Sequence, residues 1–191
     1  MKKIYLYAVA LSFAFTSCSS DAWVENDLTH TAVYKTAQPS SLIDLITTIE
    51  SDCIGITYED VQSRISAVER IAFQNRDFQK LAQKGYCIPK VSDWTYLSTT
   101  EKTDVIEELN YSETVKSYLY AMLIDQQEFA DSFFMNTSLS VSEQQLLETC
   151  RLLNDNGDDD PWKDTRPITF AYGYQTSEAN GVLMALISSQ Q

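Results

Sequence analysis

The chain has 191 residues, with 14 Lys and Arg against 27 Asp and Glu, and a formal net charge of −13. Such an acidic surface repels nucleic-acid phosphates and anionic headgroups, which argues against nucleic-acid binding and favours cationic partners or metal ions. Apolar residues make up 44% of the chain but it has only 5 Gly and 4 Pro, which indicates a helical globular protein rather than a β-sandwich with many tight turns.

Residues 1–18 have the three parts of a secretory signal peptide. Two lysines precede an apolar run over residues 4–15, and at roughly 12 residues this run is too short to span a bilayer, which takes about 20. Two small residues then lead into Cys18. This ending resembles the lipobox of bacterial lipoproteins, in which Leu is the usual residue at the place of Phe15. A secretory peptide that is cut nearby without lipidation is the alternative.

The resemblance implies that Cys18 becomes the new N-terminus and carries a fatty acyl lipid such as palmitate. Ser19 follows it where inner-membrane lipoproteins have Asp, so the family rule implies an outer-membrane lipoprotein that faces the periplasm or the cell surface. The run from Ser19 to Asp21 is also similar to the acidic leader of Bacteroidota lipoproteins. Without residues 1–17 the chain keeps 12 Lys and Arg against 27 Asp and Glu, a net charge of −15.

Residues 18–40 are polar and weakly periodic, and Pro39 closes them. We therefore expect a tether between the lipid and a folded domain. The predicted organisation is a signal peptide over residues 1–17, a tether over 18–40 and a single helical domain over 41–191.

Apolar residues at helical spacing predict several helices in this domain. In its first half they indicate a helix from Ser40 to near Gly55, a second helix that begins at Thr57, and a short third helix over residues 77–83. Residues 86–97 lack this spacing, so they are predicted to be irregular.

Further helices are predicted from about Thr99 and from Ser112, and the apolar face of the second can be continued to Phe134. Ser140 and Glu143 match a capping box, in which the serine caps the helix and the glutamate reaches back, so another helix begins there.

The last part of the domain has a different pattern. Residues 167–174 alternate between large apolar and smaller side chains, which predicts a short extended segment before a final helix that begins at Ser177. Together these signals predict an all-α fold, a single irregular bundle of five to seven helices.

Three cysteines lie in the predicted domain. Cys150 shares a helix face with leucines and is expected to be a buried thiol. Cys53 and Cys87 each follow a helical stretch, and in an oxidising compartment they could form a disulfide. Such a bridge would close a loop of about 35 residues and stabilise the fold by roughly 3–4 kcal/mol. Two free thiols are the alternative.

An acidic loop is the candidate metal site. Asp155, Asp158, Asp159 and Asp160 could supply oxygen ligands for Ca²⁺ in a loop that contains Gly157. The spacing of an EF-hand is absent, so a solvated acidic loop beyond a helix end is the alternative. Apart from this ion and the covalent lipid, no cofactor is expected.

Aromatic residues gather beside this loop. Trp162, Phe170, Tyr172 and Tyr174 lie close to Arg166 in the sequence, and Trp and Tyr are enriched in recognition surfaces. These side chains are the candidate binding patch. Ordinary packing in the core is the alternative.

The sequence contains no G-x-S-x-G, H-E-x-x-H, P-loop or dinucleotide-binding pattern. Its single histidine, His30, lies in the predicted tether, where a general base is not held beside a nucleophile. We therefore expect a lipid-anchored cell-envelope protein that acts by binding, with a basic protein or peptide as the partner that its charge favours. The alternatives are an envelope hydrolase that uses paired carboxylates and a Ca²⁺-stabilised structural module.

Overall fold

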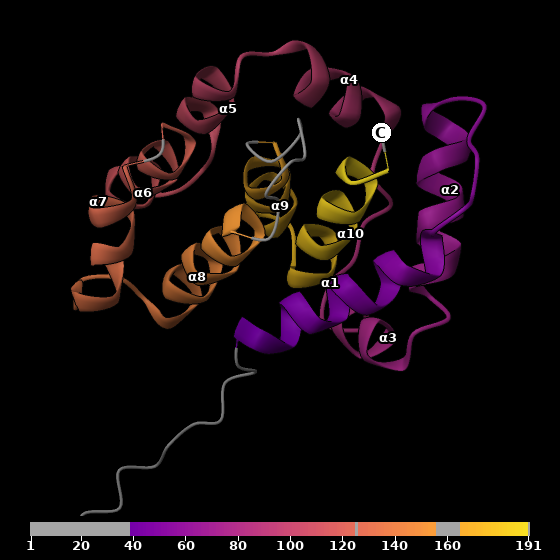
Figure 1. Cartoon of the computed structure of the whole chain (residues 1–191), viewed down its shortest axis with the longest axis horizontal. Coiled ribbons are helices and arrows are strands. Elements are labelled where there is room, and N and C mark those ends of the chain that lie inside the picture. Colours follow the sequence, from indigo (N-terminus) through magenta and orange to yellow (C-terminus); the bar gives the residue numbers. More distant parts are fainter. Residues whose placement is uncertain (1–38, 125, 156–164, 191) are drawn as a thin grey trace, which may run out of the picture. The chain divides into compact units, whose positions relative to one another are not determined.

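The computed structural model describes residues 39–124, 126–155 and 165–190, and across these residues it contains ten α-helices, one 3-10 helix and no β-strand (Figure 1). The predicted all-α class is confirmed for this part of the chain, whereas the predicted number of five to seven helices is too low. The helices are α1 (Pro39–Cys53), α2 (Val61–Ala72), α3 (Arg76–Ala82), α4 (Val91–Thr99), α5 (Lys102–Glu108), α6 (Glu113–Leu123), α7 (Gln127–Asp131), η1 (Ser132–Met135), α8 (Val141–Asp155), α9 (Arg166–Tyr174) and α10 (Glu178–Ser188).

Several helices begin where a side chain caps them. Ser112 accepts a hydrogen bond from the N–H of Val115 at the start of α6, and Ser177 does the same for Asn180 at the start of α10. Both helix starts were predicted from the sequence. At α2, however, the N-cap is Asp60 rather than Thr57, because the Asp60 carboxylate accepts from the N–H of Ser63 at 2.7 Å.

Two segments differ from the prediction. One contains a helix whose sequence lacks a strong apolar period, and the other was predicted as one helix but is interrupted. Residues predicted as irregular contain α4, where the Asp93 carboxylate accepts from the N–H of Lys90 at 3.0 Å. The continuous helix from Ser112 to Phe134 is also wrong, because α6 ends at Leu123. There the N–H of Gln126 donates to the carbonyl of Ala121, five residues back, at 2.8 Å.

The predicted extended segment over residues 167–174 is a helix, α9. Pro167 occupies the first turn of α9, where the missing N–H costs nothing and the fixed φ suits the helix. Every residue from Pro167 to Ala171 is buried, and large side chains alternate with the small Thr169, Ala171 and Gly173. The apparent alternation therefore reflects side-chain size and not a strand.

Helices α9 and α10 form the centre of the core. All residues of α10 from Ala179 to Ser188 are buried, because α10 packs against α9 on one side and against α1, α2 and α3 on others (Figure 1). Two glycines allow this approach. A Cβ atom on Gly173 would lie 2.4 Å from the backbone oxygen of Asn180, and one on Gly181 would lie 3.0 Å from the ring of Phe170.

One buried amide fixes the connection before α4 to this centre. The side chain of Asn180 accepts from the N–H of Cys87 at 3.0 Å and donates to the carbonyl of Cys87 at 2.7 Å. The pair of bonds satisfies both backbone groups of Cys87, as a neighbouring strand would.

The cysteines are separate thiols in the structure. Cys53 is fully buried at the end of α1, whereas Cys87 is exposed, so the predicted Cys53–Cys87 bridge is not formed. The two thiols differ in environment, since that of Cys53 lies in the core and that of Cys87 lies at the surface. Burial, followed by the nearby carboxylates of Asp52 and Glu50, raises the pKa of the Cys53 thiol. Cys150 is buried as predicted, and its Sγ donates to the carbonyl of Pro167 at 3.4 Å.

No helix among the described residues has the length and apolar character needed to cross a membrane.

We predict that Gly173→Ala lowers the free energy of unfolding by about 3 kcal/mol, as overpacking against a fixed backbone does. The loss outweighs the gain of about 1 kcal/mol that alanine has over glycine in a helix. Urea unfolding followed by circular dichroism measures it. Gly181→Ala is the control, because its new methyl group meets the side chain of Phe170, which can move, and its cost is smaller. Equal midpoints for Gly173→Ala and the parent would contradict the close approach.

A second prediction concerns Glu143, whose carboxylate accepts from the N–H and the Oγ of Ser140, both at 2.8 Å, and from the Oγ of Ser112 at 3.1 Å. These bonds, the one from the Ser140 backbone first, hold the pKa of Glu143 below its usual 4.5. The stabilisation is therefore fully present above pH 4.5 and is lost as the pH falls through the folded pKa.

Glu143→Gln should accordingly lower the free energy of unfolding by about 1 kcal/mol at neutral pH, the value of a typical cap, and the difference from the parent should shrink in acid. Urea unfolding between pH 3 and 7 checks this. Glu148→Gln removes the same charge from the middle of α8 without removing these hydrogen bonds, and it should show a smaller difference at neutral pH. A Glu143→Gln deficit that stays constant down to pH 3 would refute the interpretation.

Candidate functional site

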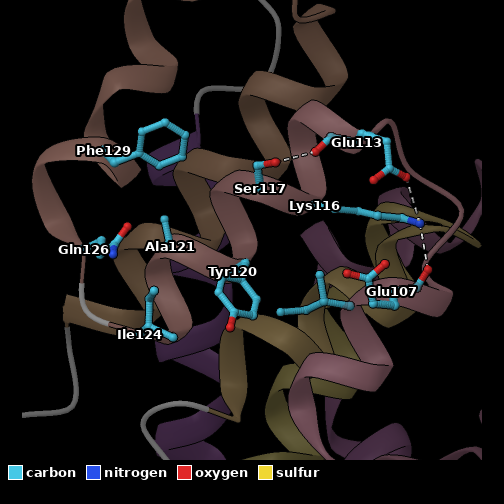
Figure 2. Close-up of a pocket in the computed structure, with 10 residues that line it drawn as sticks. Glu107, Glu113, Lys116, Ser117, Tyr120, Ala121, Ile124, Gln126 and Phe129 are labelled. Atoms are coloured by element: carbon cyan, nitrogen blue, oxygen red, sulfur yellow. Dashed lines mark hydrogen bonds and ion pairs between the residues drawn. The ribbon is translucent and has the colours of Figure 1, made fainter.

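A groove between α5, α6 and α7 is the candidate functional site (Figure 2). Its volume is about 450 Å³, within the range of ligand pockets. Unlike a typical folded surface it presents three large apolar side chains together, since Tyr120, Ile124 and Phe129 are 43%, 44% and 48% exposed. The full lining comprises Ile106, Glu107, Glu113, Lys116, Ser117, Tyr120, Ala121, Ile124, Gln126 and Phe129. Exposed apolar groups that gather in one hollow are typical of interaction sites.

Helical spacing explains why α6 supplies most of the groove. Lys116, Tyr120 and Ile124 follow one another at intervals of four, so they lie on one face of the helix. The opposite face packs into the core through buried residues that include Val115 and Leu119. Helix α6 thus separates a groove face from a core face.

The two ends of the groove differ in polarity. At one end, the Nζ of Lys116 lies 3.4 Å from Oε1 of Glu113 and donates to the carbonyl of Glu107 at 2.7 Å (Figure 2). Within the described part of the chain, no Lys or Arg pairs with the Glu107 carboxylate. The other end is apolar, because the ring of Phe129 stacks on Tyr118 with centroids 5.2 Å apart. The groove therefore offers a carboxylate at one end and apolar surface at the other.

Exposed apolar side chains continue along the chain into η1. Phe134 is 50% exposed and Met135 is 87% exposed. Phe134 stacks on the buried ring of Phe133, with ring centroids 4.1 Å apart. The Arg151 guanidinium lies over the ring of Phe134, 5.6 Å from the centroid of that ring.

The residues of the predicted binding patch are placed apart by the structure. Phe170 is fully buried, and Arg166 pairs with Oε2 of Glu50 at 3.0 Å. Tyr174 is half-buried, with its ring centroid 5.4 Å from that of Phe170. Tyr172 is half-buried and lines a separate small pocket. These four side chains do not form one open surface, which fits the packing alternative, and Trp162 lies outside the described residues.

The candidate metal ligands remain untested. Asp155 is the last residue of α8, and Asp158, Asp159 and Asp160 lie outside the described residues, as do Cys18 and His30. Where side chains are described, no group of three or more His, Cys, Asp or Glu residues is arranged to hold a metal ion.

The hydrolase alternative requires two inward carboxylates in one cleft. Among the side chains that the structure describes, the buried polar residues are threonines, asparagines and a serine, and none is Asp or Glu. Glu107 and Glu113 both line the groove, but both are exposed, and the side chain of Glu113 is 87% exposed. The described residues therefore give this alternative no support.

Sequence analysis did not identify Tyr120, Ile124 and Phe129 as surface residues. A signal was present, because Tyr118 to Ile124 is a nearly unbroken apolar run, wider than the single stripe by which a helix packs onto a core. An excess of this kind indicates a second apolar face, although the sequence does not say whether another helix covers it.

Comparisons of this chain with protein-family models, with curated proteins and with solved structures give no match.

Proposed function

We propose that this chain is a lipid-anchored protein of the bacterial cell envelope, held at the outer membrane through Cys18, that binds a basic segment of a partner protein in the groove of α5, α6 and α7. The observation that carries the proposal is the groove itself, in which the exposed side chains of Tyr120, Ile124 and Phe129 lie beside unburied carboxylates.

The partner's chemistry follows from the two ends of the groove. Covering exposed aromatic and aliphatic area stabilises a complex by roughly 25 cal/mol per Å², so the apolar end favours an apolar anchor. The carboxylate of Glu107, which is not paired with a Lys or Arg among the described residues, favours a Lys or Arg residue of the partner at the other end, because charge-assisted hydrogen bonds are the strong ones. The net charge of −15 that remains without residues 1–17 would also attract a basic partner from a distance and speed its association.

The anchor is supported by the sequence of residues 1–18 and its resemblance to a lipobox. A single attached acyl chain gives only reversible membrane binding, and stable anchoring needs more than one. A lipidated cysteine with several acyl chains would hold the helical domain at a membrane surface, where an encounter with an envelope partner is confined to two dimensions.

Replacement of Cys18 tests the anchor. We predict that the parent chain fractionates with envelope membranes and that Cys18→Ala moves to the soluble fraction or stays unprocessed. Separation of membrane and soluble fractions, with mass spectrometry of the mature N-terminus, measures this. Ser19→Ala, a change at the next residue that removes no lipid attachment, should leave membrane attachment intact. Identical processing and fractionation of Cys18→Ala and the parent would contradict lipid anchoring.

Replacement of groove residues tests binding. We predict that Phe129→Ala and Ile124→Ala each weaken capture of a basic envelope protein at least tenfold, as loss of a central anchor does. To measure this, each chain is immobilised, and the amount of the basic envelope protein that it captures at low and at high salt is quantified by mass spectrometry.

Val141→Ala is the matched control, because Val141 is 59% exposed and lies outside the groove. Capture should weaken with salt for the parent and for Val141→Ala, since exposed charge pairs are screened. A partner retained equally by all four chains would place binding elsewhere and overturn the groove as the site.

A further inference from the structure

We propose that a second pocket, bounded by α4, α5 and the end of α9, binds an organic cation: an alkylammonium or guanidinium group on an aliphatic stem, as in Lys and Arg side chains. The pocket has a volume of about 230 Å³. It is lined by Tyr96, Val105, Glu108, Leu109, Tyr172 and Gln175. This inference does not depend on the groove or on its proposed partner.

Two aromatic rings form the walls of the pocket. The ring centroids of Tyr96 and Tyr172 are 5.9 Å apart and their planes are inclined by 35°. Both rings are half-buried, which fixes their orientation while leaving part of each open to the pocket. A cation within about 6 Å of a ring centroid is attracted by the negative face of the ring, and two rings add their attractions.

The carboxylate of Glu108 lines the pocket and is hydrogen-bonded to one of these tyrosines. The hydroxyl of Tyr96 donates to Oε2 of Glu108 at 2.8 Å, which positions the carboxylate at the pocket and leaves its other lone pairs available. Over the described residues, no Lys or Arg forms an ion pair with Glu108. The nearest lysine along α5, Lys102, instead donates from Nζ to the carbonyl of Leu97.

Carboxylates lie near both tyrosines and add to the effect of burial on their pKa values. Burial, followed by the hydrogen bond to Glu108 and the charges of Glu108 and Asp104, raises the pKa of Tyr96 to about 12. Burial also raises the pKa of Tyr172, and the charges of Asp93 and Glu108 add to that effect. Three carboxylates therefore act on the same two rings, and a bound cation would be attracted by all of them.

The floor of the pocket suits an aliphatic stem. Val105 on α5 and Leu109, which caps the end of α5, are 0% and 2% exposed, so the floor is apolar and part of the core. Lys and Arg side chains bury their methylene groups on such surface while the charged end stays near polar groups. The volume of about 230 Å³ is below the 300–1,000 Å³ of pockets for drug-sized ligands, which favours a single side chain.

The remaining lining residue holds the pocket in shape. Oε1 of Gln175 accepts from the N–H of Asn110 at 2.6 Å, and its Nε2 donates to the carbonyl of Tyr172 at 3.2 Å. Its amide is thereby committed to the backbone and does not place a free donor against a cation. A hard ion such as Ca²⁺ needs six to eight oxygen ligands, which aromatic walls and an apolar floor do not provide.

Titration of the detergent-solubilised full chain tests the pocket. The probes are the N-acetyl methylamides of lysine and arginine, with those of norleucine and citrulline as neutral counterparts of nearly the same shape. Isothermal titration calorimetry and the ring proton signals of the tyrosines report binding. We expect the lysine or arginine probe to bind with a dissociation constant on the order of 1 mM and to bind about tenfold or more tightly than its neutral counterpart. Equal binding of charged and neutral probes, or no binding of either cation, would overturn the proposal.

Glu108→Gln and Glu107→Gln form a matched pair, because the two residues are adjacent and only Glu108 lines this pocket. Glu108→Gln should weaken binding of the cationic probe about tenfold, because a charge-assisted hydrogen bond is lost. Glu107→Gln should leave this affinity unchanged. Tyr172→Phe keeps the ring and should bind like the parent, whereas Tyr172→Leu should bind more weakly. Urea midpoints establish that each variant is folded, and equal effects of Glu107→Gln and Glu108→Gln would place the cation elsewhere.

One more probe distinguishes the source of the cation. Butylammonium carries the charged group and aliphatic stem of lysine without a backbone. If butylammonium binds as tightly as the lysine probe, the pocket is a site for free organic cations. Binding confined to the amino-acid probes identifies a site for a side chain of a peptide or protein. Both outcomes retain the cation pocket.

Discussion

The backbone of Asn180 occupies the place where any side chain at position 173 would begin, and the arrangement of the other described helices depends on this approach of α9 to α10. Because α10 then lies within the core, it is apolar around its whole circumference and can receive α1, α2 and α3 as well as α9. Asn180 has a second role, since its amide binds both backbone groups of Cys87 and thereby fixes the chain that leads into α4. The pocket of Tyr96 and Tyr172 exists because α9 packs on α10 and because Asn180 of α10 fixes the chain that leads into α4.

Local chemistry made the helix starts at Ser112, Ser140 and Ser177 predictable, because a cap is a hydrogen bond between residues two or three apart. Features set by tertiary packing were not predictable. Helix α9 was expected to be extended because large and small side chains alternate along it, although most of them are buried in a helix. The number of helices was underestimated for a different reason, since the apolar face of α6 was continued to Phe134, whereas α6 ends at Leu123 and α7 and η1 follow as separate elements.

The candidate sites show the same division. Clustering in the sequence brought Arg166, Phe170, Tyr172 and Tyr174 together as a patch, yet a helix sends neighbouring side chains in different directions. Tyr172 and Arg166 line two different pockets, and Phe170 is buried in the core. The adjacent Glu107 and Glu108 were similarly uninformative in the sequence, because charged neighbours on a helix usually belong to a solvated surface. In the structure they line two different hollows on α5. That difference depends on how α6, which follows α5 directly, and α9, which comes much later in the chain, pack around α5.

The place of α10 along the chain has a consequence for folding. Helices α1, α2 and α3 bury apolar residues against α10, from which they are separated by well over a hundred residues for most of their length. Contacts of such long sequence separation form late, because a large loop must be closed before they can stabilise anything. Helix α1 also packs on α2 and α8, but the apolar surface that α1, α2 and α3 bury against α10 stays uncovered until α10 is available.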